Sequence, residues 1–343
     1  MALLGFLPLR SLFEHSSGLR AACPVMLSIE VDEDGGLISL VFQRAVQTCC
    51  YTYRSCRDPP TAQWLSDKSG VPEMLHSIDG LPFTSHWRPW LLEQLSAQTV
   101  EIEVESVLKK HRGISPNNPF LQPSVMTYTY DVRPAEVVQR VMQAAIQISS
   151  EMAEDLGCLE AEEEGVWRNR RARVTESDDE IKNTLPAFSI DQDSSDATPF
   201  RGGTYDLMQS LATRQATKAA LASLAASEKS AAAHELLQKY CDENADLFVG
   251  EIRKHAADHF LEGLLELPVT LRMNGPKDGA QGEGCSGGAP SMVDPRAICE
   301  EILEWRIAIG TQWIERLEAV PGLLLELKRE HLESSSSPSI LED

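Results

Sequence analysis

The clearest hydrophobic pattern follows Pro134, where apolar residues recur at intervals of three and four positions. This spacing predicts an amphipathic helix that Pro134 opens and Gly157 ends, because proline suits a first helical turn and glycine a helix end. One stripe of this helix carries Val137, Val138, Val141, Met142, Ala145, Ile148, Met152 and Leu156. We therefore expect the helix to pack on one side against other helices.

The C-terminal part of the chain has the same kind of pattern. Helices are predicted over residues 204–226, 230–247 and 251–272, and from Asp294-Pro295 onward. The last helix has a good N-cap, an aspartate, and a proline at its first position. Residues 274–291 are rich in glycine, serine and proline, which indicates a loop. Residues 201–333 are thus predicted to form a helical bundle, followed by a disordered tail at 334–343.

Residues 61–157 are predicted to form an N-terminal helical block, although their pattern is less uniform. Apolar spacing favours a helix over 89–112, but the sequence VEIEV within it alternates and leaves a strand open. Residues 125–132 are predicted to be a short extended stretch. Residues 1–60 comprise a presequence-like start and a region without a clean period, which stays unassigned.

Acidic side chains dominate residues 158–200, with 11 acids against five bases and few apolar residues. This composition predicts a disordered linker, since little burial is available to offset the entropy of ordering. The run Glu162-Glu163-Glu164 is accordingly interpreted as solvated charge. The predicted fold class is mostly α: a helical block and a C-terminal helical bundle joined by an acidic linker.

The two proline-initiated helices match in register. When Pro134 is set on Pro295, apolar positions coincide from Val137 with Ile298 to Leu156 with Leu317. Plain helical periodicity explains some of this match, and duplication of a common unit is the alternative.

Charge excludes two classes of partner. The chain has 31 Lys and Arg against 52 Asp and Glu, a formal net charge of −21. An acidic protein of this kind is not expected to bind nucleic acid or an anionic membrane surface. Eight scattered cysteines without a C-x-x-C pair predict reduced thiols and no zinc ribbon.

Residues 1–28 differ from the rest because they hold a single acid, Glu14, against Arg10 and Arg20. An acid-poor start with Arg and Ser is typical of an organelle-targeting presequence, such as a transit peptide. A disordered N-terminus is the alternative.

Catalytic motifs are absent from the sequence, including G-x-S-x-G, the P-loop and G-x-G-x-x-G in a strand–helix context. His255 and His259 are spaced i and i+4, which places two imidazoles on one face of a helix and makes them weak candidates for a metal site. No third ligand of clear spacing follows, so neither a metal nor another cofactor is predicted.

Residues 213–224, Thr-Arg-Gln-Ala-Thr-Lys-Ala-Ala-Leu-Ala-Ser-Leu, resemble the first core helix of the RbcX family of small helical Rubisco assembly chaperones. The sequence HFLEGLLE at 259–266 is similar to the Tyr-Leu-Glu-x-Leu element of that family. The helix with Ile302, Leu303 and Arg306 resembles its last helix. The resemblance implies a helical chaperone fold for about a third of the chain.

The resemblance also has departures. In the family, tyrosines on the first helix line a dimer groove that grips the C-terminal peptide of the Rubisco large subunit. Here Leu211 and Arg214 occupy those places, and Glu301 stands where the family has an arginine. The fold is therefore expected to carry over more readily than the peptide specificity.

These patterns favour a non-catalytic, protein-binding helical protein, with a plastid assembly or folding chaperone as its specific form. The predicted partner-binding surface comprises Leu211, Arg214, Gln215, Lys218, Trp305 and Arg306. A protein client such as the Rubisco large subunit, a homodimer, and a plastid or otherwise cytoplasmic location are further expectations. The alternatives are a metal-dependent enzyme that uses His255 and His259, and a purely structural helical scaffold.

Overall fold

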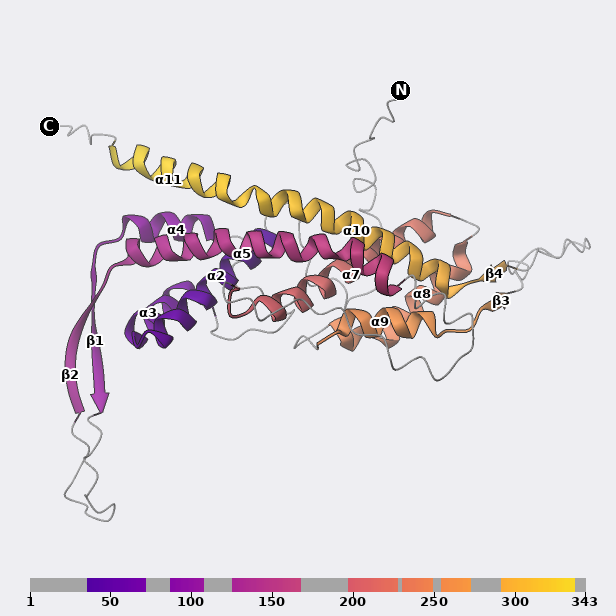
Figure 1. The fold of residues 1–343 in the computed structure, drawn as a ribbon, viewed down its shortest axis with the longest axis horizontal. Helices are drawn as coiled ribbons and strands as arrows, with labels where there is room; N and C mark the ends of the chain where they lie inside the picture. Colours follow the sequence, from indigo (N-terminus) through magenta and orange to yellow (C-terminus); the bar gives the residue numbers. More distant parts are fainter. Residues whose placement is uncertain are drawn as a thin grey trace, which may run out of the picture.

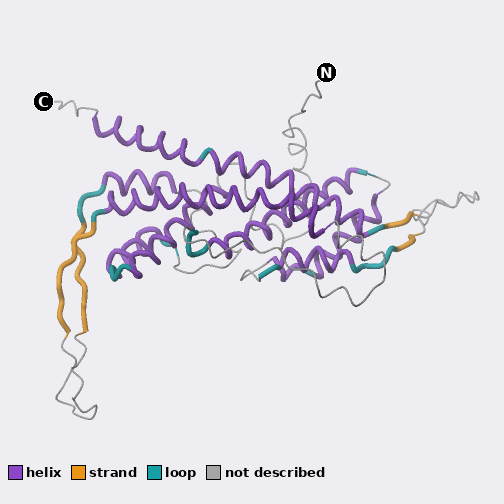
Figure 2. The backbone as a smooth tube through the Cα atoms, in the orientation of Figure 1, coloured by secondary structure: helices purple, strands orange, loops and turns teal. Residues whose placement is uncertain are grey.

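The computed structural model describes residues 36–71, 87–107, 125–167, 197–227, 230–248, 254–272 and 291–336. Helices account for most of these residues, and two antiparallel hairpins account for the strands (Figure 2). The prediction of a mostly α-helical protein is confirmed. In this part of the chain, no helix is both long and apolar enough to cross a membrane.

The described residues of the N-terminal half form four helices and a β-hairpin before η3, and α2 arises from the region that sequence analysis left unassigned. In chain order they are α2 (Gly36–Ser55), α3 (Pro59–Ser69), α4 (Trp87–Ser96), β1 (Val100–Val107), β2 (Val125–Val132) and α5 (Pro134–Glu162). Strong local signals define α3: Asp58 caps its N-terminus by accepting from the Thr61 amide, and Gly70 ends it in the left-handed conformation.

The helix predicted over 89–112 is wrong for residues 97–107, and residues 108–112 lie outside the described residues. Strand β1 follows instead, and it pairs with β2 so that Ile102 faces Tyr130 and Glu103 faces Thr129. The alternation of acidic and apolar residues therefore places carboxylates on one face of the hairpin and apolar side chains on the other. The extended stretch predicted over 125–132 is confirmed as β2.

Helix α5 passes through Gly157, where sequence analysis ends it, and continues to Glu162. A π-helical turn, η3 (Glu163–Trp167), follows directly. Residues 158–167 are therefore helical rather than part of a linker, and residues 168–196 of the predicted linker lie outside the described residues. Leu159, which is buried, extends the apolar stripe by one further turn.

The C-terminal half begins at α7 and corrects two boundaries. Its elements are α7 (Arg201–Ala226), α8 (Ala231–Glu243), η5 (Ala245–Phe248), α9 (Ala256–Leu265), β3 (Thr270–Arg272), β4 (Ser291–Val293), α10 (Pro295–Glu318) and α11 (Val320–Ser336). The helix predicted over 230–247 gives way to the 3-10 turn η5 after α8. The helix predicted over 251–272 is shorter, since it begins at Ala256, ends at Leu265, and is followed by β3. Helix α11 runs past the predicted end of the bundle, whereas residues 337–343 of the predicted tail lie outside the described residues.

Within the described residues, the two halves repeat the same order of α-helices and strands: three helices, a β-hairpin and a long helix that starts with proline. Their packing repeats as well, since α2 packs on α3 and α5 as α7 packs on α8 and α10, and α4 packs on α5 as α9 packs on α10. The hairpins lie at opposite ends of the elongated bundle, and α5 and α10 run in opposite directions along it (Figure 1). Helical periodicity alone does not explain these features, which favour duplication.

Burial follows the register match between α5 and α10. Both members of seven matched pairs are buried: Val137 and Ile298, Val138 and Cys299, Val141 and Ile302, Met142 and Leu303, Ile148 and Ile309, Met152 and Trp313, Leu156 and Leu317. Side chains from both halves belong to one hydrophobic cluster. An ion pair of 2.7 Å between Arg201 Nη2 and Asp155 Oδ1 also joins α7 to α5. The described helices of the two predicted blocks thus share a single core.

Candidate functional site

Three of the six predicted contact residues lie inside the bundle. The exposed fractions are 5% for Leu211, 3% for Arg214 and 0% for Arg306. Leu211 and Arg214 are the positions where the RbcX resemblance would place groove-lining tyrosines. In this structure the protein's own helices cover them, so a partner does not reach these side chains directly.

The other three predicted contact residues, Gln215, Lys218 and Trp305, are partly exposed. Trp305 lines an open groove of about 590 Å³ between α7 and α10. Its other lining residues are Ser223, Ala297, Glu300, Glu301 and Glu304. Trp313, eight residues further along α10, is buried in the core, so the two tryptophans of this helix have different environments.

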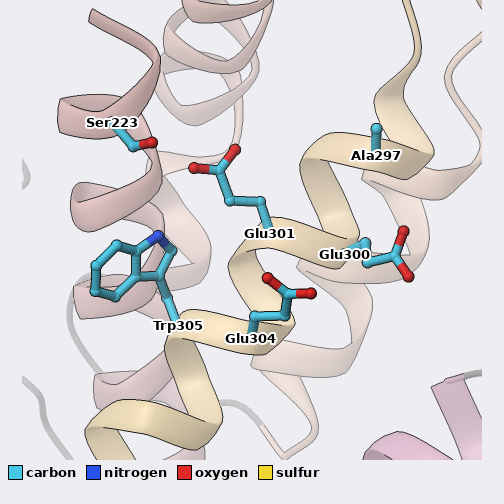
Figure 3. A pocket seen from close by; sticks show the side chains of 6 residues that line it. All are labelled: Ser223, Ala297, Glu300, Glu301, Glu304 and Trp305. Atoms are coloured by element: carbon cyan, nitrogen blue, oxygen red, sulfur yellow. The ribbon is translucent and has the colours of Figure 1, made fainter. Parts of the chain in front are cut away.

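Helical spacing brings the groove residues of α10 together. Ala297, Glu301 and Trp305 are spaced by four residues, as are Glu300 and Glu304, so they occupy neighbouring rows on the helix surface. The Glu301 carboxylate and the Trp305 indole extend toward the helix that carries Ser223, whereas Glu300 points away from it (Figure 3). The groove therefore combines an aromatic wall with carboxylates.

The groove at Trp305 is negatively charged. The named lining residues of the groove include three glutamates and no basic residue. The whole chain carries a formal charge of −21, which adds to the negative potential around the groove. A positively charged group is therefore the ligand that this surface attracts.

A second polar cluster lies inside the bundle, where Glu162 and Arg306 form an ion pair. Glu162 is 2% exposed and Arg306 0%, and the distance from Arg306 Nη2 to Glu162 Oε2 is 3.4 Å. Gln209 donates to the same carboxylate oxygen at 3.0 Å. The Tyr205 hydroxyl lies 3.4 Å from it, and the Arg306 guanidinium lies 5.9 Å from the centre of the Trp167 ring. The cluster thus joins α5, η3, α7 and α10.

Burial dominates the electrostatics of this cluster. Desolvation raises the pKa of Glu162 above its ordinary value, although the nearby Arg306 cation opposes the rise. Desolvation also raises the pKa of Tyr205, so its hydroxyl stays protonated. The ion pair is longer than the 2.7–2.9 Å that is usual for charge-assisted hydrogen bonds.

Sequence analysis missed the role of Glu162, which it assigned to a solvated acidic run. Position 162 does continue the apolar stripe of α5, three residues after buried Leu159. Its buried partner is 144 residues away in sequence, so local composition alone could not reveal the pair. Trp167, at the end of η3, is 0% exposed and was likewise assigned to the linker.

The two candidate metal ligands differ in backbone position and in carboxylate neighbour. His255 adopts a left-handed conformation at the N-cap of α9, whereas His259 lies within the helix. Each imidazole has its own carboxylate neighbour: His255 Nδ1 lies 3.5 Å from Asp258, and His259 Nδ1 lies 3.6 Å from Glu262. Among the described residues, no group of three or more His, Cys, Asp or Glu side chains is arranged to hold a metal ion.

A second groove, of about 420 Å³, lies between α5 and the junction of α10 with α11. Ile146, Ala153, Ile314 and Pro321 give it an apolar lining, and Glu154 and Glu318 add carboxylates. It includes none of the predicted contact residues. The groove at Trp305 is therefore the site where the sequence prediction and the geometry coincide.

Comparison of the chain with protein-family models, with curated proteins and with solved structures finds no match.

Proposed function

We propose that this protein is a non-catalytic, polypeptide-binding helical protein whose partner engages the groove between α7 and α10. The observation that supports this proposal is a partly exposed tryptophan, Trp305, in the wall of an open groove. Tryptophan is enriched among residues that dominate protein–protein binding energies, because a large flat ring buries much area at a small entropic cost.

An assembly or folding chaperone in a plastid is the specific form of the proposal, with the Rubisco large subunit as the candidate client. It depends on the RbcX resemblance of residues 213–224 and 259–266 and on the acid-poor N-terminal sequence. The buried Leu211 and Arg214 mean that such a chaperone would use a different surface from the family's groove.

The test compares partner recovery with folding in a set of full-length variants. Tagged wild-type protein, Trp305→Ala, Trp305→Phe and Tyr128→Ala are purified from the cells that express the protein, and the recovered proteins are quantified. Tyr128 is a matched control because it is 43% exposed and lies on the β1–β2 hairpin, away from the groove. We expect Trp305→Ala to reduce recovery of a specific partner about tenfold or more, as for an interface hot spot.

Thermal unfolding of the same variants separates binding from stability. Trp305→Ala should reduce partner recovery far more than it lowers the melting temperature, and Trp305→Phe should retain part of the binding. Equal losses of binding and stability would contradict the assignment. No partner whose recovery depends on Trp305 would favour the structural scaffold, whereas Trp305-dependent recovery of the Rubisco large subunit would support the chaperone form.

A further inference from the structure

The internal repeat allows the groove residues of α10 to be compared with the residues at the matched positions of α5. With Pro134 set on Pro295, Arg140 of α5 corresponds to Glu301 of α10, and Ala144 corresponds to Trp305. In the N-terminal half, α5 packs on α2, and the Arg140 guanidinium lies over the Tyr53 ring at 5.3 Å from its centre. A cation from the long helix thus covers an aromatic ring of the first helix.

The matched positions of α10 in the C-terminal half carry different side chains. Here α10 carries both the aromatic ring, Trp305, and the acid, Glu301, while α7 contributes the small Ser223. The groove between them is open, and Ser223 is its lining residue from α7, whereas in the other half Arg140 extends over Tyr53 of α2. Figure 3 shows the Glu301 carboxylate and the Trp305 ring on the same side of α10.

We propose that this groove binds a cationic side chain, arginine in the first place, from an extended segment of the partner polypeptide. The inference rests on the proposed function and specifies its ligand. The incoming guanidinium would stack on Trp305 and pair with Glu301 and Glu304. It would reproduce, between two molecules, the contact that Arg140 makes with Tyr53 inside this one.

The physical chemistry favours this occupant over others. A guanidinium over an indole face is attracted by the ring quadrupole, and tryptophan is the best aromatic partner for a cation. The planar fork of arginine also matches a carboxylate, which a lysine ammonium does less well. A second copy of this acidic chain is disfavoured by the charge of −21 on each molecule. An acidic segment would meet three glutamates.

The test is selection from a random peptide library displayed on phage, with full-length protein as the target. Parallel selections use Trp305→Ala and the double variant Glu301→Gln/Glu304→Gln. The matched control is Glu315→Gln/Glu326→Gln, which removes two exposed glutamates outside the groove and so has the same net charge. Thermal unfolding confirms that each variant is folded.

We expect the wild type and the control to enrich peptides with an arginine or lysine at one fixed position, and both groove variants to lose this enrichment. The best peptide is then synthesised with arginine and with citrulline, its neutral counterpart, at that position. Citrulline should weaken binding about tenfold or more, and the difference should shrink as salt is raised, because exposed charge pairs are screened.

The outcomes separate this inference from the proposed function. Enrichment that depends on Trp305 but selects apolar or acidic residues would overturn the cationic ligand and leave the peptide-binding function intact. Equal affinity for the arginine and citrulline peptides would do the same. Selection without any dependence on Trp305 would overturn both.

Discussion

The two halves of the bundle have matching apolar residues along α5 and α10 but different polar ones. At seven matched pairs between 137/298 and 156/317, apolar side chains from both helices are buried in the common core. Several matched pairs differ in kind, among them Arg140 with Glu301, Ala144 with Trp305, and Ala145 with Arg306. Shared apolar positions thus explain the shared packing, whereas these three differences fall at the groove and at the buried ion pair.

The matched residues Ala145 and Arg306 differ in whether burial requires a charged partner. Both side chains are 0% exposed, but Ala145 requires no partner and Arg306 requires an anion. Glu162 supplies that charge, and the end of α5 must therefore continue past Gly157 to place it. In this sense the polar centre of the C-terminal half depends on a residue of the N-terminal half.

The largest loss of stability is expected when the ion pair between Glu162 and Arg306 is broken. Arg306→Met removes the only cation paired with the buried Glu162 carboxylate among the described residues, and should lower the free energy of unfolding at pH 7 by about 3–5 kcal/mol. Arg306→Met combined with Glu162→Gln should recover most of this loss, because no buried charge is left uncompensated. Chemical denaturation of the full-length variants measures both. Failure of the second substitution to recover stability would show that Arg306 acts through packing rather than charge.

The pH dependence of stability tests the same pair in the wild-type protein. Burial raises the pKa of Glu162 in the folded state above the ordinary value of 4.5. Its contribution to stability is therefore complete below the pKa of the unfolded chain and is lost as pH rises through the folded pKa. Relative to Glu162→Gln, which does not titrate, the wild type should lose stability between pH 4.5 and neutral pH. Parallel curves for the two proteins in denaturation experiments across this range would contradict the raised pKa.

Strong local signals made α5 and α10 predictable from the sequence. Each helix has proline at its first position and an apolar stripe, and α10 also has an aspartate N-cap, Asp294, whose side chain accepts from the Arg296 amide. The β1–β2 hairpin was predicted only in part. Ile102 pairs with Tyr130, which is 28 residues away, and a pattern read within one segment does not contain that partner.

The candidate site was also predictable only in part: the sequence identified Trp305 but not which neighbouring residues are exposed. Trp305 stands out as a large aromatic residue on a predicted helix, and the structure places it in a groove. Arg306, its neighbour, points into the core because adjacent helical residues differ by about 100° in direction. The sequence could not identify which of the two faces solvent, since that depends on how α7, α5 and η3 pack around α10.

The smallest change in stability is expected when one tyrosine hydroxyl is removed from each half, that of Tyr240 or that of Tyr53. The Tyr240 hydroxyl donates to the buried Phe260 carbonyl at 2.7 Å and joins α8 to α9, whereas the Tyr53 ring lies beneath the exposed Arg140. Tyr240→Phe should lower the free energy of unfolding by about 1 kcal/mol, since a buried hydrogen bond is lost. Tyr53→Phe should cost less, because the cation–ring contact remains and Arg140 stays in contact with water. Denaturation of both variants at pH 7 measures the two changes in the free energy of unfolding. Equal losses would contradict this expectation, because the Tyr53 hydroxyl would then stabilise the fold as much as the Tyr240 hydroxyl does.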